Sequence, residues 1–533
     1  MTDLEHVSSA PTRPQPSGRA EARDPFALGV DDLFGTPVAE AGPDDGAAPS
    51  GLPLDEKLRQ AYFWVVNHAI ISPHYDVEFA APGARETSVR LGDSKALLSL
   101  PSDQSYSSFV LLPLLTFAVR GRCLMIGGPG RGKTASAVLM GVLAGYPVRD
   151  VRRAMQHGHP QLTVSDLFGT PLPKDLVQAD SLADVDVAWR SWLGMRVKIV
   201  DEYNRIPTRT QSALLTVMGD NYAEVLGQVF ECPDSARFLT ANDDQGGGTY
   251  QVIEALRDRI DVVVQALAFN PRFLSDLMTR IEENVRPEEL VPRQIIFDET
   301  EMDRMQEEIR EVELGPEVRR RLEFFASQFE FCEVAAEQFE YKTKDTARLA
   351  AVEWHTLATL DSGRDRLKDL GCQTKNGLSV RALMTLILYS KAIAYFRGNR
   401  AVELADVRQI LPFVLHDKLV PDAEAPFFDA PGNGTYRSDR IGWLRKLFDA
   451  SLADYDRLDL DRQDPLGELA EEFRRGLEGL PENEVRTRLS RIERLIVEWG
   501  RGKKLYGHLY DDLLKLKYLH QRYTNYLRWL ATQ

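Results

Sequence analysis

The chain carries the run Gly127-Gly128-Pro129-Gly130-Arg131-Gly132-Lys133-Thr134, which directly follows the apolar residues 123–126. This run fits the pattern G-x-x-x-x-G-K-[ST]. Glycines allow a tight turn, so that backbone N–H groups and the N-terminus of a following helix can bind phosphate oxygens. Lys133 can reach the terminal phosphates, and the Thr134 hydroxyl can ligate Mg²⁺. Because a helix is expected over residues 133–143, the run predicts a phosphate-binding loop between a strand and a helix.

A second stretch supplies the acidic groups that phosphate chemistry requires. It reads Val197-Lys198-Ile199-Val200-Asp201-Glu202, an apolar strand that ends in two carboxylates. Sheets of α/β proteins bind ligands at the carboxyl ends of their strands. Asp201 can hold the magnesium shell, and Glu202 can orient and deprotonate an attacking water. An acidic pair alone is usually just solvated, and a Gly-rich turn alone is just a turn, but the two together predict a nucleotide-hydrolysing site.

Further apolar strands, at residues 237–240 and 260–264, alternate with helical segments and predict a parallel α/β sheet. Asn242 follows the first of them and can hydrogen-bond the attacking water or the γ-phosphate. The remaining chain is mostly helical in pattern; the clearest helix spans residues 379–396 and is closed by Gly398. The sequence predicts a disordered acidic tail (1–54), an N-terminal extension packed on the core (55–104), an α/β domain (105–271), a helical domain (272–420), a linker (421–435) and a C-terminal helical region with a helical hairpin (436–533).

Composition narrows the class of protein. The 533 residues are 43% hydrophobic and 27% charged, with a formal net charge of −15. Nucleic-acid binders need basic surface to displace counterions, so the acidic balance argues against DNA or RNA as the main ligand. The sequence has no apolar run of membrane-spanning length, its first residues lack the pattern of a signal peptide, and its four cysteines form no close pair. We therefore expect a cytoplasmic protein without a membrane span.

Residues from about 105 to 420 resemble an AAA+ ATPase of the MoxR family. The resemblance rests on Asp201-Glu202-Tyr203-Asn204-Arg205-Ile206-Pro207 followed by Thr210-Gln211-Ser212-Ala213-Leu214-Leu215, which is similar to the family's D-E-x-N-R-x-P…T-Q-x-A-L-L block. The shorter matches are Asp166-Leu167-Phe168-Gly169, Glu254-Ala255-Leu256-Arg257-Asp258-Arg259 and Gly377-Leu378-Ser379-Val380-Arg381. These pieces also follow one another in the family's order. The fold that the resemblance implies is a P-loop NTPase sheet domain with an all-α lid, here with an additional C-terminal helical region.

The resemblance assigns roles to single residues. Asn242 falls at the sensor 1 position, Arg259 is the arginine finger with Arg257 as a second candidate, and Arg381 is the sensor 2 arginine that links the lid to the γ-phosphate. The implied ligands are ATP and Mg²⁺. Since the arginine finger comes from a neighbouring subunit in such proteins, the resemblance implies a ring, typically a hexamer. It also implies a client protein that is remodelled or activated, often with a von Willebrand factor A-type partner.

Some features depart from the family or leave alternatives open. Asn242 is followed by Asp243 instead of proline, and glycines at 246–248 predict a mobile loop. The lid is expected to be enlarged between about residues 325 and 370, and the chain beyond 430 has no family counterpart. A nucleic-acid motor or restriction-type NTPase and a nucleotide-gated scaffold remain as alternative functions. His157-Gly158-His159 is interpreted as a polar loop in preference to half of a metal site.

Overall fold

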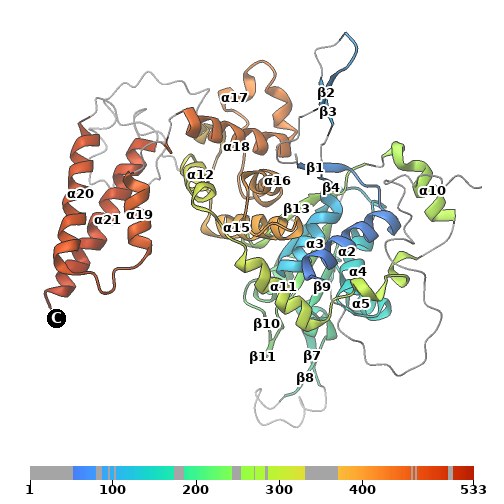
Figure 1. Cartoon of the computed structure of the whole chain (residues 1–533). Coiled ribbons are helices and arrows are strands. Elements are labelled where there is room, and N and C mark those ends of the chain that lie inside the picture. Colours follow the sequence, from blue (N-terminus) through green and yellow to red (C-terminus); the bar gives the residue numbers. More distant parts are fainter. Residues whose placement is uncertain are drawn as a thin grey trace, which may run out of the picture. The chain divides into compact units, whose positions relative to one another are not determined.

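The structure is a computed structural model of the chain, shown in Figure 1. It describes residues 52–79, 87–93, 97–100, 104–172, 185–242, 254–268, 270–282, 286–329, 370–457, 460–461, 465–501 and 508–532. Residues 52–533 form one compact unit by their contacts. Nearly all of the acidic tail expected at 1–54, the loop with glycines at 246–248, and most of the enlarged segment expected at 325–370 lie outside the described residues.

A parallel sheet of five strands forms the core of the α/β region. In spatial order its strands are β13 (Val262–Gln265), β5 (Arg122–Ile126), β12 (Ala236–Ala241), β9 (Val197–Asp201) and β6 (Gln156–His157). Every neighbouring pair is parallel. The central strand β12 is buried along its whole length, because sheets of this kind are covered on both faces and their strands are nearly continuous apolar runs. The predicted parallel α/β sheet is confirmed, while the short strand β6 was not predicted.

The helix α3 (Ser108–Val119) is the apolar centre of this region. All of its residues are buried, and it packs on three of the sheet strands as well as on helices before and after it. A helix that is apolar all round is typical of a protein core. The other helices of the region are α2 (Leu54–His68), α4 (Lys133–Leu143), α5 (Val148–Ala154), α6 (Val164–Phe168), α8 (Thr208–Gly219) and α9 (Glu254–Arg259).

Antiparallel strand pairs form separate two-stranded sheets beside the five-stranded one. The pairs are β1 (Tyr75–Phe79) with β4 (Gln104–Ser107), β2 (Thr87–Arg90) with β3 (Leu97–Leu100), β7 (Gly169–Pro171) with β8 (Val187–Trp189), and β10 (Tyr222–Val225) with β11 (Gln228–Glu231). The β7–β8 pair begins at Gly169, the last residue of the Asp166-Leu167-Phe168-Gly169 stretch. Strands β7 and β10 contact one another, and the two pairs lie side by side at the foot of the sheet in Figure 1.

Helices follow the sheet along the chain. They are α10 (Leu274–Glu282), α11 (Glu299–Glu311), α12 (Pro316–Ser327), α15 (Val380–Phe396), α16 (Leu404–Leu415), α17 (Pro426–Asp429) and α18 (Arg440–Arg457). The helix predicted at 379–396 is confirmed as α15: the Ser379 hydroxyl accepts a hydrogen bond from the N–H of Ala382, and Gly398 has a φ of +81° just after the helix. Helix α15 packs on both α16 and α3, so it connects the helical region to the sheet.

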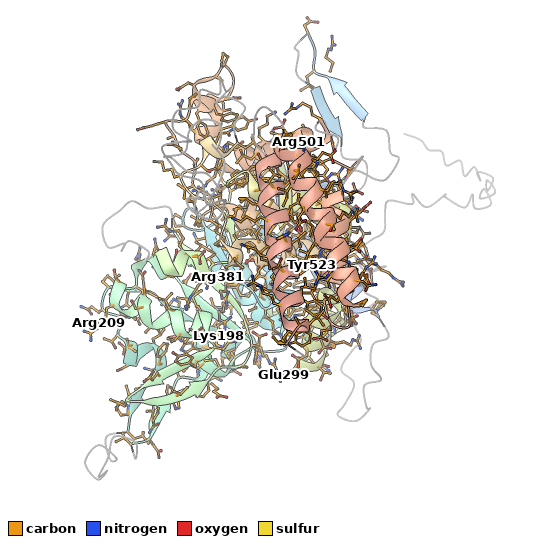
Figure 2. All side chains as sticks on the ribbon, turned by 90° about the vertical axis from the view of Figure 1, so that its left-hand side faces the viewer. Lys198, Arg209, Glu299, Arg381, Arg501 and Tyr523 are labelled. Atoms are coloured by element: carbon orange, nitrogen blue, oxygen red, sulfur yellow. The ribbon has the colours of Figure 1, made fainter. Side chains whose placement is uncertain are left out.

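The C-terminal region has its own core. Helices α19 (Pro465–Arg474), α20 (Glu482–Gly500) and α21 (His508–Leu530) share a buried cluster to which Leu469, Ile492 and Tyr523 belong. Figure 2 shows α20 and α21 lying side by side, with Tyr523 labelled between them. The helical hairpin predicted from the apolar stripes is therefore confirmed. In the part of the chain that the structure describes, no helix is both long enough and apolar enough to cross a membrane.

Candidate active site

The glycine-rich run forms a loop between strand β5, which ends at Ile126, and helix α4, which begins at Lys133. Gly132 precedes the helix with a φ of +82°, a left-handed conformation that glycine adopts without strain. No side chain of the described residues caps this helix. The first N–H groups of a helix have no partner inside it, so the N-terminus of α4 presents N–H donors and the positive end of the helix dipole to an anion.

Lys133 lies folded into this loop. Its side chain is buried, and its ammonium donates to the carbonyl oxygens of Gly127 at 2.5 Å and Gly128 at 2.8 Å and to Asn242 Oδ1 at 2.9 Å. All three partners are oxygens, so phosphate oxygens can replace them without changing the chemistry around the ammonium. Arg131, in contrast, donates through Nη1 to the carbonyl of Ala266 at 2.9 Å. Its guanidinium is thus held at the end of β13, and its backbone forms part of the loop.

Asp201 stands at the end of β9, opposite the start of α4. Its Oδ1 accepts a hydrogen bond from Thr134 Oγ1 at 2.9 Å and another from Thr240 Oγ1 at 2.6 Å. A hydroxyl and a carboxylate beside a phosphate loop match the oxygen ligands that Mg²⁺ takes together with waters and phosphates. Thr134 and Asp201 are therefore the residues that fit this ion. Thr240 was missed by the sequence reasoning, although its place on the strand before Asn242 puts it at the same edge.

Glu202 is held in a strained conformation next to Asp201. Its φ is +52°, which is uncommon for a residue other than glycine and is found preferentially at functional sites. Its N–H donates to Thr240 Oγ1 at 2.9 Å, its Oε1 accepts from Asn242 Nδ2 at 2.9 Å, and its Oε2 lies 3.3 Å from Arg205 Nη1. The carboxylate is one third exposed. It can therefore meet a water molecule while its backbone stays fixed.

The carboxyl ends of β5, β9 and β12 thus bring together one set of predicted residues. We call this set the phosphate edge, defined as residues 127–134, Asp201, Glu202 and Asn242. The hydrogen bond between Lys133 and Asn242 connects the loop to β12, and the bond between Thr134 and Asp201 connects it to β9. The contacts place a candidate cation site and a candidate base within one hydrogen-bonded network.

A cavity of about 210 Å³ adjoins the phosphate edge. Its lining includes loop residues and apolar side chains from distant parts of the chain: Gly130, Arg131, Ile71, Phe109, Leu277 and Ile281. The segment after α2 is close to the loop, because a Cβ added to Gly132 would lie 3.5 Å from the carbonyl oxygen of Ile70. The lining also includes polar residues, among them Ser72, His74 and Gln265, so the cavity combines apolar surface with hydrogen-bonding groups, as small-molecule sites commonly do.

The other predicted site residues, Arg259 and Arg381, lie at the opposite edge of the sheet. Arg259 ends α9, just before β13, and Asp261 donates its N–H to the carbonyl of Arg122, the first residue of β5. Arg259 donates through Nη1 to the carbonyl of Leu215 and lies 3.8 Å from Asp220. Its guanidinium is therefore seated on the C-terminal turn of α8, where carbonyl groups attract cations. Its neighbour Arg257 is exposed.

Arg381 approaches the same edge from the first turn of α15. Its Nη1 makes an ion pair with Asp258, and the Ser379 hydroxyl lies 3.5 Å from the other oxygen of Asp258. We call Asp258, Arg259 and Arg381 the arginine edge. The structure thus brings Arg381 next to the arginine-finger candidate, separated from the phosphate loop of its own chain by the length of β5.

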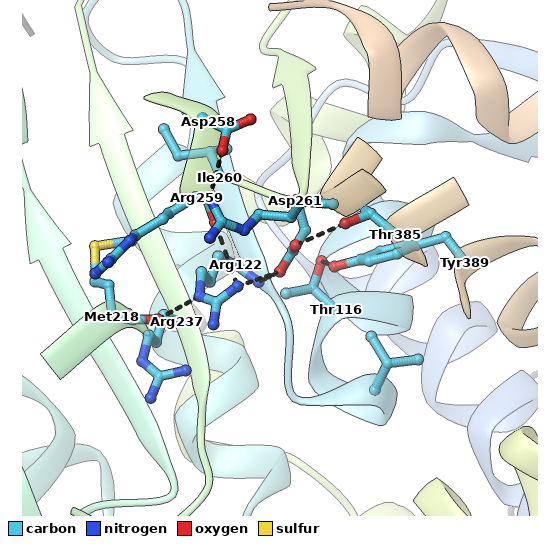
Figure 3. A network of polar contacts seen from close by, with 12 residues as sticks. Thr116, Arg122, Met218, Arg237, Asp258, Arg259, Ile260, Asp261, Thr385 and Tyr389 are labelled. Atoms are coloured by element: carbon cyan, nitrogen blue, oxygen red, sulfur yellow. Dashed lines mark hydrogen bonds and ion pairs between the residues drawn. The ribbon is translucent and has the colours of Figure 1, made fainter. Parts of the chain in front are cut away.

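The hydrogen bonds drawn in Figure 3 connect the arginine edge to helix α15 of the helical region. Asp261 accepts hydrogen bonds from the N–H of Arg122 at 2.8 Å and from Thr385 Oγ1 on α15 at 3.1 Å. Arg122 in turn donates to the carbonyls of Met218 at 2.6 Å and Arg259 at 3.4 Å. These hydrogen bonds join α15 to the backbone that carries Arg259.

Buried cations lie near the starts of the strands. Burial lowers the pKa of Lys418 to about 8, and its ammonium donates to the carbonyl of Ile260 at 2.5 Å. Burial likewise lowers the pKa of Lys198 to about 7 and that of Arg237 to about 10. Lys198 and Arg237 are direct register partners on β9 and β12. Desolvation penalises each charged form, so these groups lose their protons at lower pH than exposed groups of the same type do.

The chain is similar in sequence to known families and to a known protein. Residues 122–262 match the family described as ATPase family associated with various cellular activities (AAA), and residues 371–432 match the AAA lid domain. The chain is 25% identical over 305 residues to Chaperone MoxR1 of Mycobacterium tuberculosis, an alignment that covers 56% of this chain and 68% of that protein. A crystal structure of a candidate ATPase from Cytophaga hutchinsonii aligns with a TM-score of 0.45 and 16% identity, over 73% of this chain and 94% of that one.

Proposed function

The chain belongs to the MoxR family of AAA+ ATPases, and on that premise we propose that it couples hydrolysis of ATP to remodelling or activation of a client protein. The proposed assembly is a ring, typically a hexamer, with a von Willebrand factor A-type protein as the candidate partner. The name of the Mycobacterium tuberculosis relative, a chaperone, supports a protein client. The proposal places the activity in the cytoplasm, where buried thiols such as Cys123 and Cys232 stay reduced.

The observation that carries the ATPase proposal is the hydrogen-bonded phosphate edge. When ATP enters, Lys133 exchanges the carbonyls of the loop and the amide of Asn242 for phosphate oxygens. Thr134 and Asp201 would hold Mg²⁺, which would supply positive charge beside the phosphates. Glu202 orients the attacking water and accepts its proton, and its fixed backbone keeps the carboxylate in place. Asn242, already hydrogen-bonded to Glu202, aligns that water with the γ-phosphate.

The cavity next to the loop is the proposed binding site for the aromatic base of the nucleotide. Ile71 and Phe109 come from one side of the cavity, and Leu277 and Ile281 come from helix α10. Helix α10 is fixed to the end of α2 by Arg280, whose Nη1 donates to the carbonyls of Val66 and Ala69. Stacking against apolar side chains recognises an aromatic base, while the loop holds the phosphates.

The arginine edge supports the ring. A guanidinium that stabilises the transferring phosphoryl group raises the rate by about 10³–10⁵. Arg259 and Arg381 lie at the opposite edge of the sheet from the loop of their own chain, since they lie where the strands begin and the loop lies where β5 ends. A neighbouring subunit that places its loop against these side chains completes the site. The proposed reaction centre is thus shared between two chains.

Turnover and binding of ATP with Mg²⁺ test the proposal. The unmodified chain is expected to release phosphate, and Glu202→Gln is expected to retain ATP while turnover falls by about 10²–10⁴. Lys133→Ala is expected to lose ATP retention, because the ammonium that replaces solvent around the phosphates is gone. ATP binding that is equally tight with and without Lys133 would refute the proposed site.

The client is tested separately. Turnover is measured with and without proteins encoded by neighbouring genes, and Glu202→Gln held in ATP serves as bait for capture. A protein that changes the turnover and binds only the ATP-held chain identifies the client. Unchanged turnover and no complex with any of them would contradict the chaperone part of the proposal and leave the ATPase part standing.

A further inference from the structure

The short strand β6 places a histidine and a glycine against the two acidic residues of the phosphate edge. His157 is the parallel register partner of Asp201, and Gly158 donates its N–H to the carbonyl of Asp201 at 2.7 Å. Segment 156–158 therefore runs along the outer side of β9 up to the point where the strand ends. It adds a wall to the site on the side opposite β12.

Gly158 touches the backbone of Glu202 so closely that no side chain fits there. A Cβ added to Gly158 would lie 2.2 Å from the Glu202 carbonyl oxygen and 2.9 Å from its carbonyl carbon. These are backbone atoms, so an added methyl group can be accommodated only if the Glu202 peptide moves. On its other side, the N–H of Glu202 donates a hydrogen bond to Thr240 Oγ1 at 2.9 Å. Gly158 and Thr240 thus hold the strained backbone of Glu202 between them.

His157 faces the free side of the Asp201 carboxylate. Its Nδ1 lies 3.5 Å from Oδ2, whereas Oδ1 accepts the hydroxyls of Thr134 and Thr240. The imidazole, whose side chain is 63% exposed, thus lies beside the carboxylate oxygen that neither hydroxyl contacts. Partners of a metal-binding carboxylate commonly set its orientation, and their loss weakens metal binding by about 10–100-fold.

We propose that His157 and Gly158 are positioning residues for ATP hydrolysis: His157 orients Asp201 toward Mg²⁺, and Gly158 sets the backbone from which Glu202 addresses the water. This inference rests on the proposed ATPase function and extends it to a part of the chain outside the loop and the acidic pair. It also gives the His157-Gly158-His159 sequence a role other than that of a polar loop or half of a metal site.

Single substitutions with matched controls test the two halves of the inference. Gly158→Ala is compared with Gly194→Ala, because an added Cβ at Gly194 meets nothing within 4 Å. His157→Ala is compared with His159→Ala, an exposed histidine two residues along the chain, and with His157→Asn, which restores a short polar side chain. The measurements are binding of a fluorescent ATP analogue as a function of Mg²⁺ concentration, and steady-state turnover.

Gly158→Ala is expected to lower kcat by about a hundredfold, as a displacement of about 1 Å in a reacting group can do, while KM for ATP stays within about twofold. His157→Ala is expected to raise the Mg²⁺ concentration for half-maximal analogue binding by about tenfold, with partial recovery in His157→Asn. Both control substitutions are expected to behave like the unmodified chain.

The outcomes separate this inference from the proposed function. If Gly158→Ala loses stability along with activity, the Mg²⁺ titration of His157→Ala decides. A His157→Ala protein with an unchanged Mg²⁺ requirement, or a folded Gly158→Ala protein with the turnover of Gly194→Ala, overturns the inference. If the unmodified chain binds the analogue without hydrolysing it, the proposed turnover fails and the Mg²⁺ titration still decides on His157. If it binds no nucleotide, both proposals are overturned.

Discussion

The two edges of the central sheet differ in what they can do alone. At the phosphate edge, side chains from α4, β9 and β12 converge within hydrogen-bond distance: Lys133 with Asn242, Thr134 with Asp201, and Asn242 with Glu202. At the arginine edge, Arg259 and Arg381 are engaged with Leu215 and Asp258 of their own chain. The five residues of β5 separate the two edges by about 16 Å.

This difference supports the proposal that one chain contributes to two reaction centres, one through each edge. The phosphate edge has groups that can bind phosphate, hold a cation and activate water, but Arg259 and Arg381 of the same chain lie a strand length away. The arginine edge presents guanidinium groups on a backbone joined to α15 through Asp261. In the proposed ring, we expect hydrolysis at one interface to act on the helical region of the neighbouring chain through these hydrogen bonds.

Replacing the arginine-finger candidate is expected to have the largest effect and to distinguish the roles of the two edges. Arg259→Ala is expected to lower turnover by about 10³–10⁵, since the charge on the transferring phosphoryl group loses its guanidinium. Binding of ATP to dispersed subunits is expected to stay unchanged, because Arg259 does not belong to the phosphate edge of its own chain. Phosphate release and analogue binding measure the two effects.

Arg257→Ala is the matched control for this substitution. Its side chain is exposed and lies two residues from Arg259 on the same short helix. We expect a much smaller loss of turnover from it. A larger loss of turnover from Arg257→Ala than from Arg259→Ala would identify Arg257 as the arginine finger and contradict the assignment to Arg259.

Replacing Arg381 is expected to reduce turnover less than replacing Arg259 does. Arg381→Ala is expected to lower turnover by about 10–100-fold, the effect of one charge-assisted hydrogen bond of about 1.5–3 kcal/mol. Asp258→Asn leaves the guanidinium in place but loosens it, so its effect is expected to be weaker than that of Arg381→Ala. Weaker ATP binding by dispersed Arg381→Ala subunits, with turnover otherwise normal, would instead place Arg381 in the site of its own chain.

The smallest expected effect concerns stability near the strand starts. Burial lowers the pKa of Lys198 from 10.5 to about 7. Between these values the unfolded chain binds more protons than the folded one, so the free energy of unfolding rises with pH. From pH 7 to pH 9 Lys198 alone accounts for a rise of about 2 kcal/mol.

Urea unfolding of Lys198→Met and of the unmodified chain at both pH values measures this contribution. The variant is expected to lack that part of the rise, so its stability relative to the unmodified chain falls between pH 7 and pH 9. Parallel pH dependence of the two proteins would show that the Lys198 ammonium is not penalised by burial.

The phosphate edge was largely predictable from the sequence because its signals are local. A glycine-rich run and an acidic pair each sit at the end of an apolar strand, and the carboxyl ends of parallel strands meet at one edge. The sequence did not identify Thr240 and Gly158 as parts of the site, because their roles depend on which strands become neighbours. Strand β6 is too short to show a periodic pattern, and His157 is recognisable only from its register with Asp201.

The arginine edge was less predictable. Resemblance singled out Arg259 and Arg381, but nothing in the order of residues showed that Asp258 would join them or that α8 would seat the finger. These contacts connect segments 123 and 44 positions apart in the chain and are fixed by tertiary packing. In the stretch predicted as a linker, the proline- and glycine-rich composition also gave no indication of helix α17, whose Phe428 is buried.

Mixing two inactive variants tests the shared site most directly. Glu202→Gln chains keep the arginines but cannot activate water, and chains with both Arg259→Ala and Arg381→Ala keep the phosphate edge intact. In rings formed at random from equal amounts, roughly a quarter of the interfaces combine an intact phosphate edge with an intact arginine edge. Turnover in the mixture is expected to return to roughly a quarter of the rate of the unmodified chain. Mixed rings that co-assemble but stay as inactive as either variant alone would contradict the shared site.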